Sequence, residues 1–245
     1  MAKHNVLRFY AELKAYEPKI WRRFEINGEK TVAELAYAVM IMFEMRASHL
    51  FSMKKFVREP LLKELSEEFS DEAVKIFMEK YQEEMFKDIR YELPTENRHF
   101  YNDEEIIAAD NIKLNQTANK VGTTFDFLYD FGDSWEISLV VEHFEKQEVP
   151  LATLPKILDG KRFGIVEDIG GVGGLEELVL AFKERSGMEY EHFINWIGDT
   201  DFDLEYFDKD EMNFRLKKLM RVYKEIYEYD LEPTKKFFKL LMRDN

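Results

Sequence analysis

The sequence contains no cysteine. The chain can therefore form no disulfide, no thiolate zinc site and no cysteine nucleophile, which removes three common routes to stability and catalysis. A chain without cysteine suits a reducing compartment, and we predict that the protein is cytoplasmic.

Long apolar runs are absent as well. The first residues, MAKHNVLRFYAEL, lack the uninterrupted apolar core of a signal peptide. No run approaches the roughly 20 apolar residues that a membrane-spanning helix needs. We therefore expect no membrane association.

The chain has fewer positively than negatively charged side chains. The chain carries 35 lysines and arginines against 49 aspartates and glutamates, a formal net charge of −14. A field of that sign repels phosphate backbones, so we expect no strong non-specific nucleic-acid binding outside a local basic groove. The basic stretch RLKKLMRVYK (215–224) has its tyrosine on an apolar stripe, which favours a solvated helix face over a nucleic-acid surface.

What is present is typical of a folded protein, with 45% hydrophobic and 15% aromatic residues. Residues 6–15 alternate between apolar and polar, and IWRRFEI follows a turn, which predicts a hairpin of two half-buried strands. Thr31 and Glu34 form a capping box that starts a helix ending near Met45. HLFSMKKF then predicts another strand.

Helical patterns dominate two later regions. Residues 57–92 are charged and periodic at helical spacing, which predicts a helical insertion at about 57–95 outside the sheet. LEELVLAFKE and EYEHFINWIG predict two helices, and C-terminal helices are predicted from about 205. We therefore expect one α+β domain over residues 1–245. It has an antiparallel sheet of two hairpins plus a further strand, packed against helices, with a helical insertion and a helical C-terminus.

The second hairpin is predicted at YDFGDSWEISLVVE (129–142), where the register decides which side chains share a face. A loop of residues 132–134 sets Phe131 opposite Trp135 and makes one face wholly apolar, whereas a two-residue loop would put a glutamate into that face. The predicted buried face consists of Phe125, Phe127, Tyr129, Phe131, Trp135, Ile137, Leu139 and Val141.

The same register gathers carboxylates at the hairpin tip. It places Asp130 opposite Glu136, and like charges directly across a strand pair are unfavourable unless something offsets them. Asp130, Asp133 and Glu136 could hold a divalent cation through oxygen ligands. We favour the alternative that Asp133 and its neighbours only make the turn, and we expect neither a metal nor a cofactor.

Two arginines on the second strand are the expected partners of these carboxylates. Arg22 and Arg23 point to opposite faces of the strand, so only one of them can join a given cluster. That arginine could bind an anion with two hydrogen bonds, or pair with Asp130, Glu136 or Glu167. We predict an Arg–carboxylate network as the resting arrangement.

Several stretches, in this order along the chain, are similar to a known family. They are YEPKIWRRF, HLFSM, FLYDFGDSWEISLVVE, LDGKRFGIVEDIGGVGGLEELVLAF and WIGDTDFDLEYFD. Together they resemble the plasmid pRiA4b ORF-3-like family, whose pattern has P-x-I-W-R-R, then Y-x-Y-D-F-G-D-x-W, then P-P-E-D-x-G-G-x-x-G. The resemblance covers most of the chain except about residues 57–95, as an insertion would.

The resemblance implies an α+β domain on an antiparallel sheet, in a largely uncharacterised family found on plasmids, mobile elements and bacterial or archaeal chromosomes. The chain departs from the pattern at Ile165 and Val166, where the family has two prolines, and it lacks the family's cysteines there. Ile137 stands where the family often has a histidine, which weakens a metal site at the hairpin.

The family-like blocks supply the remaining candidates for a polar site. GGVGG (170–174) precedes a helix but lacks the lysine of a phosphate-binding loop, so a turn that permits close backbone packing is favoured. No pair of histidines has zinc-protease spacing, and His49 is the one histidine at a family-like junction. The complete candidate site is Arg22, Arg23, His49, Asp130, Asp133, Trp135, Glu136, Glu167, Asp168, Gly170 and Gly171.

Two functions follow from these residues. The first is a non-enzymatic binding or interaction protein, associated with plasmid or mobile-element gene content and able to bind a protein partner. The second is a metal-dependent hydrolase or nuclease that uses the carboxylate cluster. The second gains if three carboxylates converge at the hairpin tip, and the first gains if Arg22 or Arg23 fills that space. The sequence favours the first.

Overall fold

A single eight-stranded sheet organises the molecule, in the order β5-β4-β3-β6-β7-β1-β2-β8. The computed structural model describes residues 2–81, 86–94 and 106–243. Neighbouring strands are antiparallel except β4 and β5, which are parallel. The strands are β1 His4–Leu13, β2 Trp21–Asn27, β3 Phe51–Lys55, β4 Ile89–Glu92, β5 Ile106–Ala108, β6 Thr124–Tyr129, β7 Trp135–Gln147 and β8 Lys156–Lys161.

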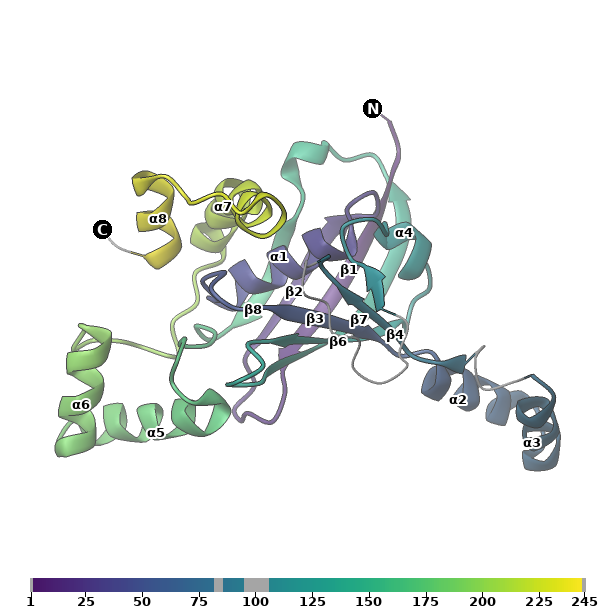
Figure 1. Cartoon of the computed structure of the whole chain (residues 1–245), viewed down its shortest axis with the longest axis horizontal. Coiled ribbons are helices and arrows are strands. Elements are labelled where there is room, and N and C mark those ends of the chain that lie inside the picture. Colours follow the sequence, from purple (N-terminus) through teal and green to yellow (C-terminus); the bar gives the residue numbers. More distant parts are fainter. Residues whose placement is uncertain (1, 82–85, 95–105, 244–245) are drawn as a thin grey trace.

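The helices differ in how deeply they are embedded, as Figure 1 shows. In the described part they are α1 Val32–Met42, α2 Arg58–Glu68, α3 Asp71–Lys80, α4 Leu114–Thr117, α5 Gly171–Glu184, α6 Met188–Ile197, α7 Lys209–Tyr229 and α8 Lys235–Met242. The expectation of a mixed α/β fold with a mostly antiparallel sheet and helices at the C-terminus is confirmed. None of the described helices has the length and apolar character needed to cross a membrane.

Helix α1 lies at the centre of the core. Its predicted capping box is present: the Glu34 N–H donates to Thr31 Oγ1 over 3.1 Å, and the Thr31 N–H donates to Glu34 Oε2 over 3.0 Å. The sheet covers one side of α1 and α7 the other, where Tyr37 stacks on Tyr227 with ring centroids 5.5 Å apart. A helix covered on two sides has little room for polar residues, which explains the run VAELAYAVMIM.

The β6–β7 pair buries the face that the alternation predicts, but in a different register. Tyr129 lies opposite Trp135 and Phe127 opposite Ile137, so residues 130–134 form the loop. The predicted pairing of Phe131 with Trp135 is therefore wrong, and Phe131 is 51% exposed in the loop. The other seven predicted face residues are buried. Loops of three and five residues both keep these side chains on one face of the sheet. The predicted buried face is therefore correct for these seven residues, although the predicted cross-strand pairs are not.

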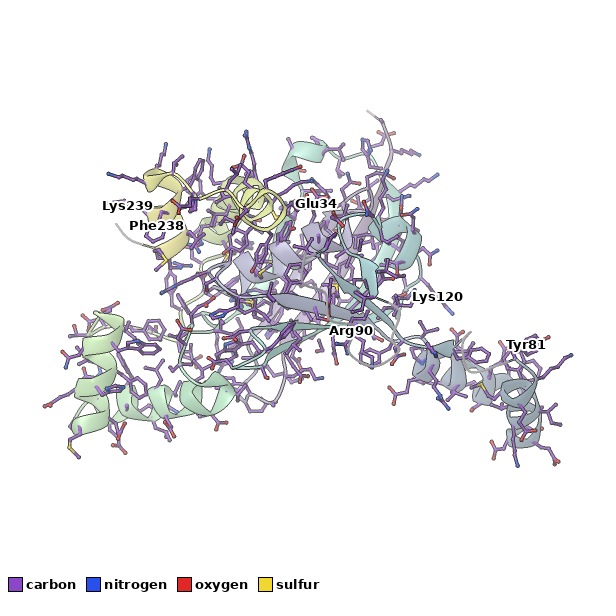
Figure 2. The ribbon with its side chains drawn as sticks, viewed as in Figure 1. Glu34, Tyr81, Arg90, Lys120, Phe238 and Lys239 are labelled. Carbon is purple, nitrogen blue, oxygen red and sulfur yellow. The ribbon has the colours of Figure 1, made fainter. Side chains whose placement is uncertain are left out.

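Residues 57–92 are only partly the helical insertion that was predicted. Helices α2 and α3 project from one end of the sheet (Figure 1), and Tyr81 marks the far end of this arm in Figure 2. No residue of α2 is buried, and Val74 is the one buried residue of α3. Ile89–Glu92, however, is strand β4, paired on both sides, so this part of the prediction is wrong. The end of the predicted insertion, at residue 95, lies outside the described residues.

The sheet is also larger than two hairpins plus one strand. Strands β4 and β8 were not predicted, and β5 overlaps DEEII (103–107), which the sequence indicates only as a possible short strand. Strands β4 and β5 have only four and three residues, and β8 pairs with β2 through an irregular register between Arg23 and Phe24. Segments this short or irregular do not show the alternation that identifies a strand.

Candidate functional site

His49 lies in the loop between α1 and β3, where two neighbouring contacts orient it. The Tyr227 hydroxyl donates to the His49 carbonyl over 2.6 Å. The imidazole meets the Tyr129 ring edge to face, with centroids 5.7 Å apart. These contacts fix the loop and leave Nε2 directed at the tip of the β6–β7 hairpin, where three carboxylates face it.

Asp130 is the first of these carboxylates. It follows the last residue of β6 and has a left-handed backbone with φ 53°, a conformation that aspartate tolerates better than most residues. Its Oδ1 accepts from the Gly132 N–H over 2.9 Å, which closes the loop. Its Oδ2 lies 3.6 Å from His49 Nε2.

Glu167 is the buried member of the group. Oε1 accepts from the Arg46 N–H at 2.6 Å and from the Tyr129 hydroxyl at 2.7 Å, and Oε2 accepts from Ser48 Oγ at 2.8 Å. Burial and the adjacent Glu167 charge raise the pKa of Tyr129, so its hydroxyl stays protonated and donating at neutral pH. Glu167 Oε2 is 3.3 Å from His49 Nε2.

Asp168 completes the set from the solvent side. Its side chain is 72% exposed, and its Oδ1 lies 3.4 Å from His49 Nε2. Ligand atoms of His49, Asp130 and Asp168 all lie within 4.8 Å of one another. Two segments far apart in sequence, the hairpin tip and residues 167–168, therefore meet around one imidazole nitrogen.

The distances from His49 Nε2 to the three carboxylates fit metal ligands better than hydrogen bonds. Nε2 can donate only one hydrogen bond, of about 2.7–3.2 Å, yet three carboxylate oxygens lie at 3.3, 3.4 and 3.6 Å. Nitrogen and oxygen ligands each about 2.1 Å from a shared ion are separated by about 3.0–3.4 Å when they are adjacent. The observed spacing is close to that range, and the exposed Asp168 is the ligand with most freedom to adjust.

The glycines after Asp168 dock the hairpin tip on α5. The Gly170 N–H donates to Asp133 Oδ2 over 3.1 Å. Gly171 has φ 70°, and a Cβ there would lie 2.5 Å from the Asp133 carbonyl oxygen. Only glycine permits this approach, so GGVGG provides the close backbone packing that was favoured over phosphate binding.

Four of the sequence candidates lie away from His49. Glu136 lies opposite Leu128, not Asp130, and pairs with Lys14 over 2.7 Å. Trp135 is a buried core residue.

The arginines are the other two, and the predicted Arg–carboxylate network is wrong. Arg22 donates only to backbone carbonyls, and Arg23 pairs with Glu142 over 2.7 Å. The metal set considered from sequence, Asp130, Asp133 and Glu136, is not brought together either.

Two residues that shape the site, Tyr129 and Ser48, were not among the candidates from the sequence. Tyr129 was assigned to the apolar face, and its ring is buried there, but its hydroxyl reaches Glu167 at the edge of that face. Ser48 adjoins His49 in the sequence and bonds to Glu167. Adjacency to His49 was the one available signal, and no sequence pattern reveals a bond between residues 119 positions apart.

Two cavities adjoin the cluster. One has a volume of about 300 Å³ and extends toward Phe163, Trp196 and Arg243. The other has a volume of about 390 Å³ and extends toward the turn after α7 and the second half of α8. Both are lined by Arg46, Glu167 and Asp168, so the cluster stands beside two partly open hollows where a ligand can bind.

Comparisons with known proteins agree with the fold. A crystal structure of MM3350, a protein of unknown function from Methanosarcina mazei Go1, has a TM-score of 0.64 and 22% identity, covering 86% of this chain and 98% of that one. The uncharacterized protein y4hQ of Sinorhizobium fredii is 28% identical over 119 residues. That match covers 48% of this chain and 58% of the relative.

The family assignment rests on a longer match. The model of the plasmid pRiA4b ORF-3-like proteins matches residues 5–211, from the start of β1 into α7. It includes the loop of His49, the β6–β7 hairpin and the segment of Glu167 and Asp168. This protein therefore belongs to the plasmid pRiA4b ORF-3-like family.

Proposed function

We propose that this protein is a binding protein whose central site holds a divalent cation between His49, Asp130 and Asp168. The observation that carries the proposal is the convergence of three carboxylates on one imidazole nitrogen at 3.3–3.6 Å. Neither Arg22 nor Arg23 occupies this space, so the arrangement that would have favoured a metal-free site is absent from the described residues.

The donor set favours some cations over others. One imidazole with two or three carboxylates suits Mn²⁺, Fe²⁺ or Zn²⁺, whereas Mg²⁺ and Ca²⁺ prefer oxygen ligands alone. Glu167 supports the site by positioning its other members. Its hydrogen bonds with Arg46, Ser48 and Tyr129 hold the His49 loop and the hairpin tip around the site. We expect Mn²⁺ and Zn²⁺ to bind more tightly than Ca²⁺.

A second candidate function is metal-dependent hydrolysis, and the convergence of three carboxylates meets the condition that the sequence set for it. The exposure of Asp168 and the adjoining cavities favour it, because an ion reached from solvent would keep coordination positions for water, and a metal-bound water can act as a nucleophile.

Association with plasmid or mobile-element gene content is a separate expectation that the family name motivates.

Calorimetric titration of the full chain with MnCl₂, ZnCl₂ and CaCl₂ tests the cation site. We expect saturable Mn²⁺ or Zn²⁺ binding, a rise in melting temperature with cation concentration, and at least about a tenfold loss of affinity in Asp168→Asn. Asp168→Asn is chosen because its exposed side chain contributes little to packing.

His143→Ala is the matched control, since His143 is a half-exposed histidine on β7 that pairs with Glu145. It should leave cation affinity unchanged. If the wild type binds no cation, or if Asp168→Asn and His143→Ala bind alike, the proposed centre is wrong. Turnover of a chromogenic phosphodiester with Mn²⁺, abolished by Asp168→Asn, would establish the hydrolase. Cation binding without turnover would leave the binding function.

A further inference from the structure

The larger cavity beside the cluster has mostly apolar walls. It lies between the loop of Arg46, the turn that follows α7, and α8. Ile226, Leu231, Pro233 and Phe238 are among the residues that line it. Leu231 is 53% and Phe238 48% exposed, and Figure 2 shows Phe238 on α8 near the end of the chain. Exposed apolar side chains around a cavity of about 390 Å³ are typical of a ligand pocket.

The charges at this cavity are mainly negative. Glu167, Asp168, Asp230 and Glu232 line it, against a single arginine, Arg46. The side chains of Asp230 and Glu232 have no hydrogen bond or ion pair within the described part of the chain. Arg46 contacts Glu167 through its backbone N–H, and its guanidinium forms no ion pair within the described residues. Four carboxylates against one guanidinium leave the lining of the cavity with an excess of negative charge.

The end of α7 adds to this negative potential. This helix of 21 residues ends at Tyr229 with no basic residue in its last turn, and Asp230 is its C-cap. The last carbonyls of a helix carry a partial negative charge that favours a cation nearby. The turn at residues 230–233 therefore combines a helix C-terminus, two carboxylates without partners and apolar walls.

We infer that this cavity binds an organic cation with an apolar body, such as a protonated alkylamine or a basic side chain next to an apolar residue. The apolar part fits against Leu231 and Phe238, and the ammonium group lies near Asp230 and Glu232. An anionic ligand would be repelled by four carboxylates, and a neutral one would leave Asp230 and Glu232 without a partner. The site goes beyond the proposed cation centre and does not require it.

The two sites interact through Asp168. This residue lines the cavity and also faces His49, so a divalent cation on Asp168 reduces the negative charge that an ammonium group senses. We expect each ligand to weaken the other, most strongly at low ionic strength.

Hexylamine is the probe, with 1-hexanol and hexanoate as neutral and anionic ligands of the same chain length. All three are titrated into the full chain at neutral pH with EDTA, so that no divalent cation takes part, and binding is followed by NMR shifts around Leu231 and Phe238. We expect saturable binding of hexylamine that weakens with salt, weaker binding of hexanol and none of hexanoate. Equal binding of all three, or no binding of hexylamine, overturns the inference.

Variants of the two free carboxylates locate the ammonium group. Glu232→Gln and Asp230→Asn should each weaken hexylamine by roughly fivefold, the Coulomb contribution of one nearby charge in a watery environment. Asparagine tolerates the left-handed backbone of residue 230, where φ is 51°, so the turn is preserved. Glu189→Gln, an exposed residue at the start of α6, is the matched control and should have no effect. Equal loss in all three variants overturns the assignment.

A second set of titrations identifies the source of the cation. The peptides acetyl-Leu-Lys-Leu-amide and acetyl-Leu-Gln-Leu-amide differ only in the charge. Tighter binding of the lysine peptide than of hexylamine assigns the cavity to a basic protein segment, and hexylamine binding without peptide binding assigns it to free amines. Because EDTA is present throughout, these results are independent of the cation centre, and either site can fail while the other stands.

Discussion

Arg22 is fully buried beside the sheet, and its guanidinium makes five hydrogen bonds, all to backbone carbonyls. The acceptors are Met42 at the end of α1, Trp21, and residues 161–163, where β8 ends. The ring of Phe207 lies 4.4 Å from its central carbon. Burial lowers the pKa of Arg22 to about 9, which still leaves it charged at neutral pH. Arg22 thus joins α1 to the end of β8.

Arg22→Lys is expected to destabilise the fold strongly. A lysine has three N–H groups where the arginine uses five, so at least two buried carbonyls lose their donors, at a cost of about 2–5 kcal/mol in total. Arg23→Lys is the matched control on the other face of β2, where the half-exposed pair with Glu142 should change stability by less than about 1 kcal/mol. Urea denaturation measures both, and equal losses would contradict the role of Arg22.

Phe127 lies on the buried face of the hairpin and Phe131 in its exposed loop, so substitutions at the two positions test the register. Phe127→Ala should lower the free energy of unfolding by about 3–5 kcal/mol, because the ring is fully buried between β3 and β7. Phe131→Ala should change it by less than about 0.5 kcal/mol, because that ring is in the exposed loop. Urea denaturation of both variants measures this, and a large loss for Phe131→Ala would restore the three-residue loop.

At the scale of elements, the sequence predicted which strand residues are buried but not which residues pair across neighbouring strands. Alternation in β6 and β7 identifies the buried face, because side chains repeat every two residues. It does not identify which residue lies opposite Trp135, since loops of three and five residues give the same face. The difference moved Asp130 from a position opposite Glu136 to the loop, where it faces His49.

In the candidate site too, the sequence indicates residues that belong to a local motif but not the contacts between distant segments. Asp130, Glu167 and Asp168 could be selected because the turn and the family-like blocks contain them. Arg22 and Arg23 could not be placed, because strand alternation gives two faces without saying what covers each of them. In the structure one face contacts α1 and backbone carbonyls, and the other carries Glu142.

Asp88 makes one of the contacts that attach the arm of α2 and α3, and the pair of Glu64 on α2 with Lys120 before β6 is another. Asp88 Oδ1 accepts from the N–H of Val57 over 2.9 Å, and its Oδ2 pairs with Lys54 over 3.1 Å. Partial burial acts to raise the pKa of Asp88, but the Val57 N–H, Lys54 and the Arg58 N–H outweigh it and hold the pKa below the ordinary 3.8. A lowered pKa in the folded state means that the ionised carboxylate stabilises this junction.

The stability that Asp88 contributes is therefore present above pH 3.8 and lost as the pH falls further, through the lowered pKa of the folded state. Amide exchange at Val57 and Arg58, corrected for its intrinsic pH dependence, should lose protection in that range. In Asp88→Asn protection should already be low at neutral pH and should not change on acidification. Glu79→Gln, on α3, is the control. Wild-type behaviour in Asp88→Asn would show that other contacts hold the arm.

The whole molecule divides into a body with one core and an arm that lies outside it. Within the described residues, the core contains residues from the sheet and from α1, α4, α5, α6, α7 and α8, but none from α2 or α3. Because Lys55 lies opposite Ile89, the two ends of the arm meet at neighbouring strands, where a short turn can join them. The His49 cluster lies in the loops of the body, and the hydrogen bonds and ion pairs of its members within the described residues involve neither α2 nor α3.

Replacement of residues 57–87 by a four-residue Asn-Gly turn should therefore leave the body folded. We expect one cooperative transition, a melting temperature within about 4 °C of the wild type, and unchanged cation affinity. The contrasting variant ends the chain after Glu232, which removes buried Leu241 and the ion pair of Arg243 with Glu44. That truncation should lower the melting temperature well beyond 4 °C, since it opens the core. If the arm replacement instead abolishes cooperative unfolding while the truncation does not, the arm is part of what stabilises the sheet, and the division into body and arm is wrong.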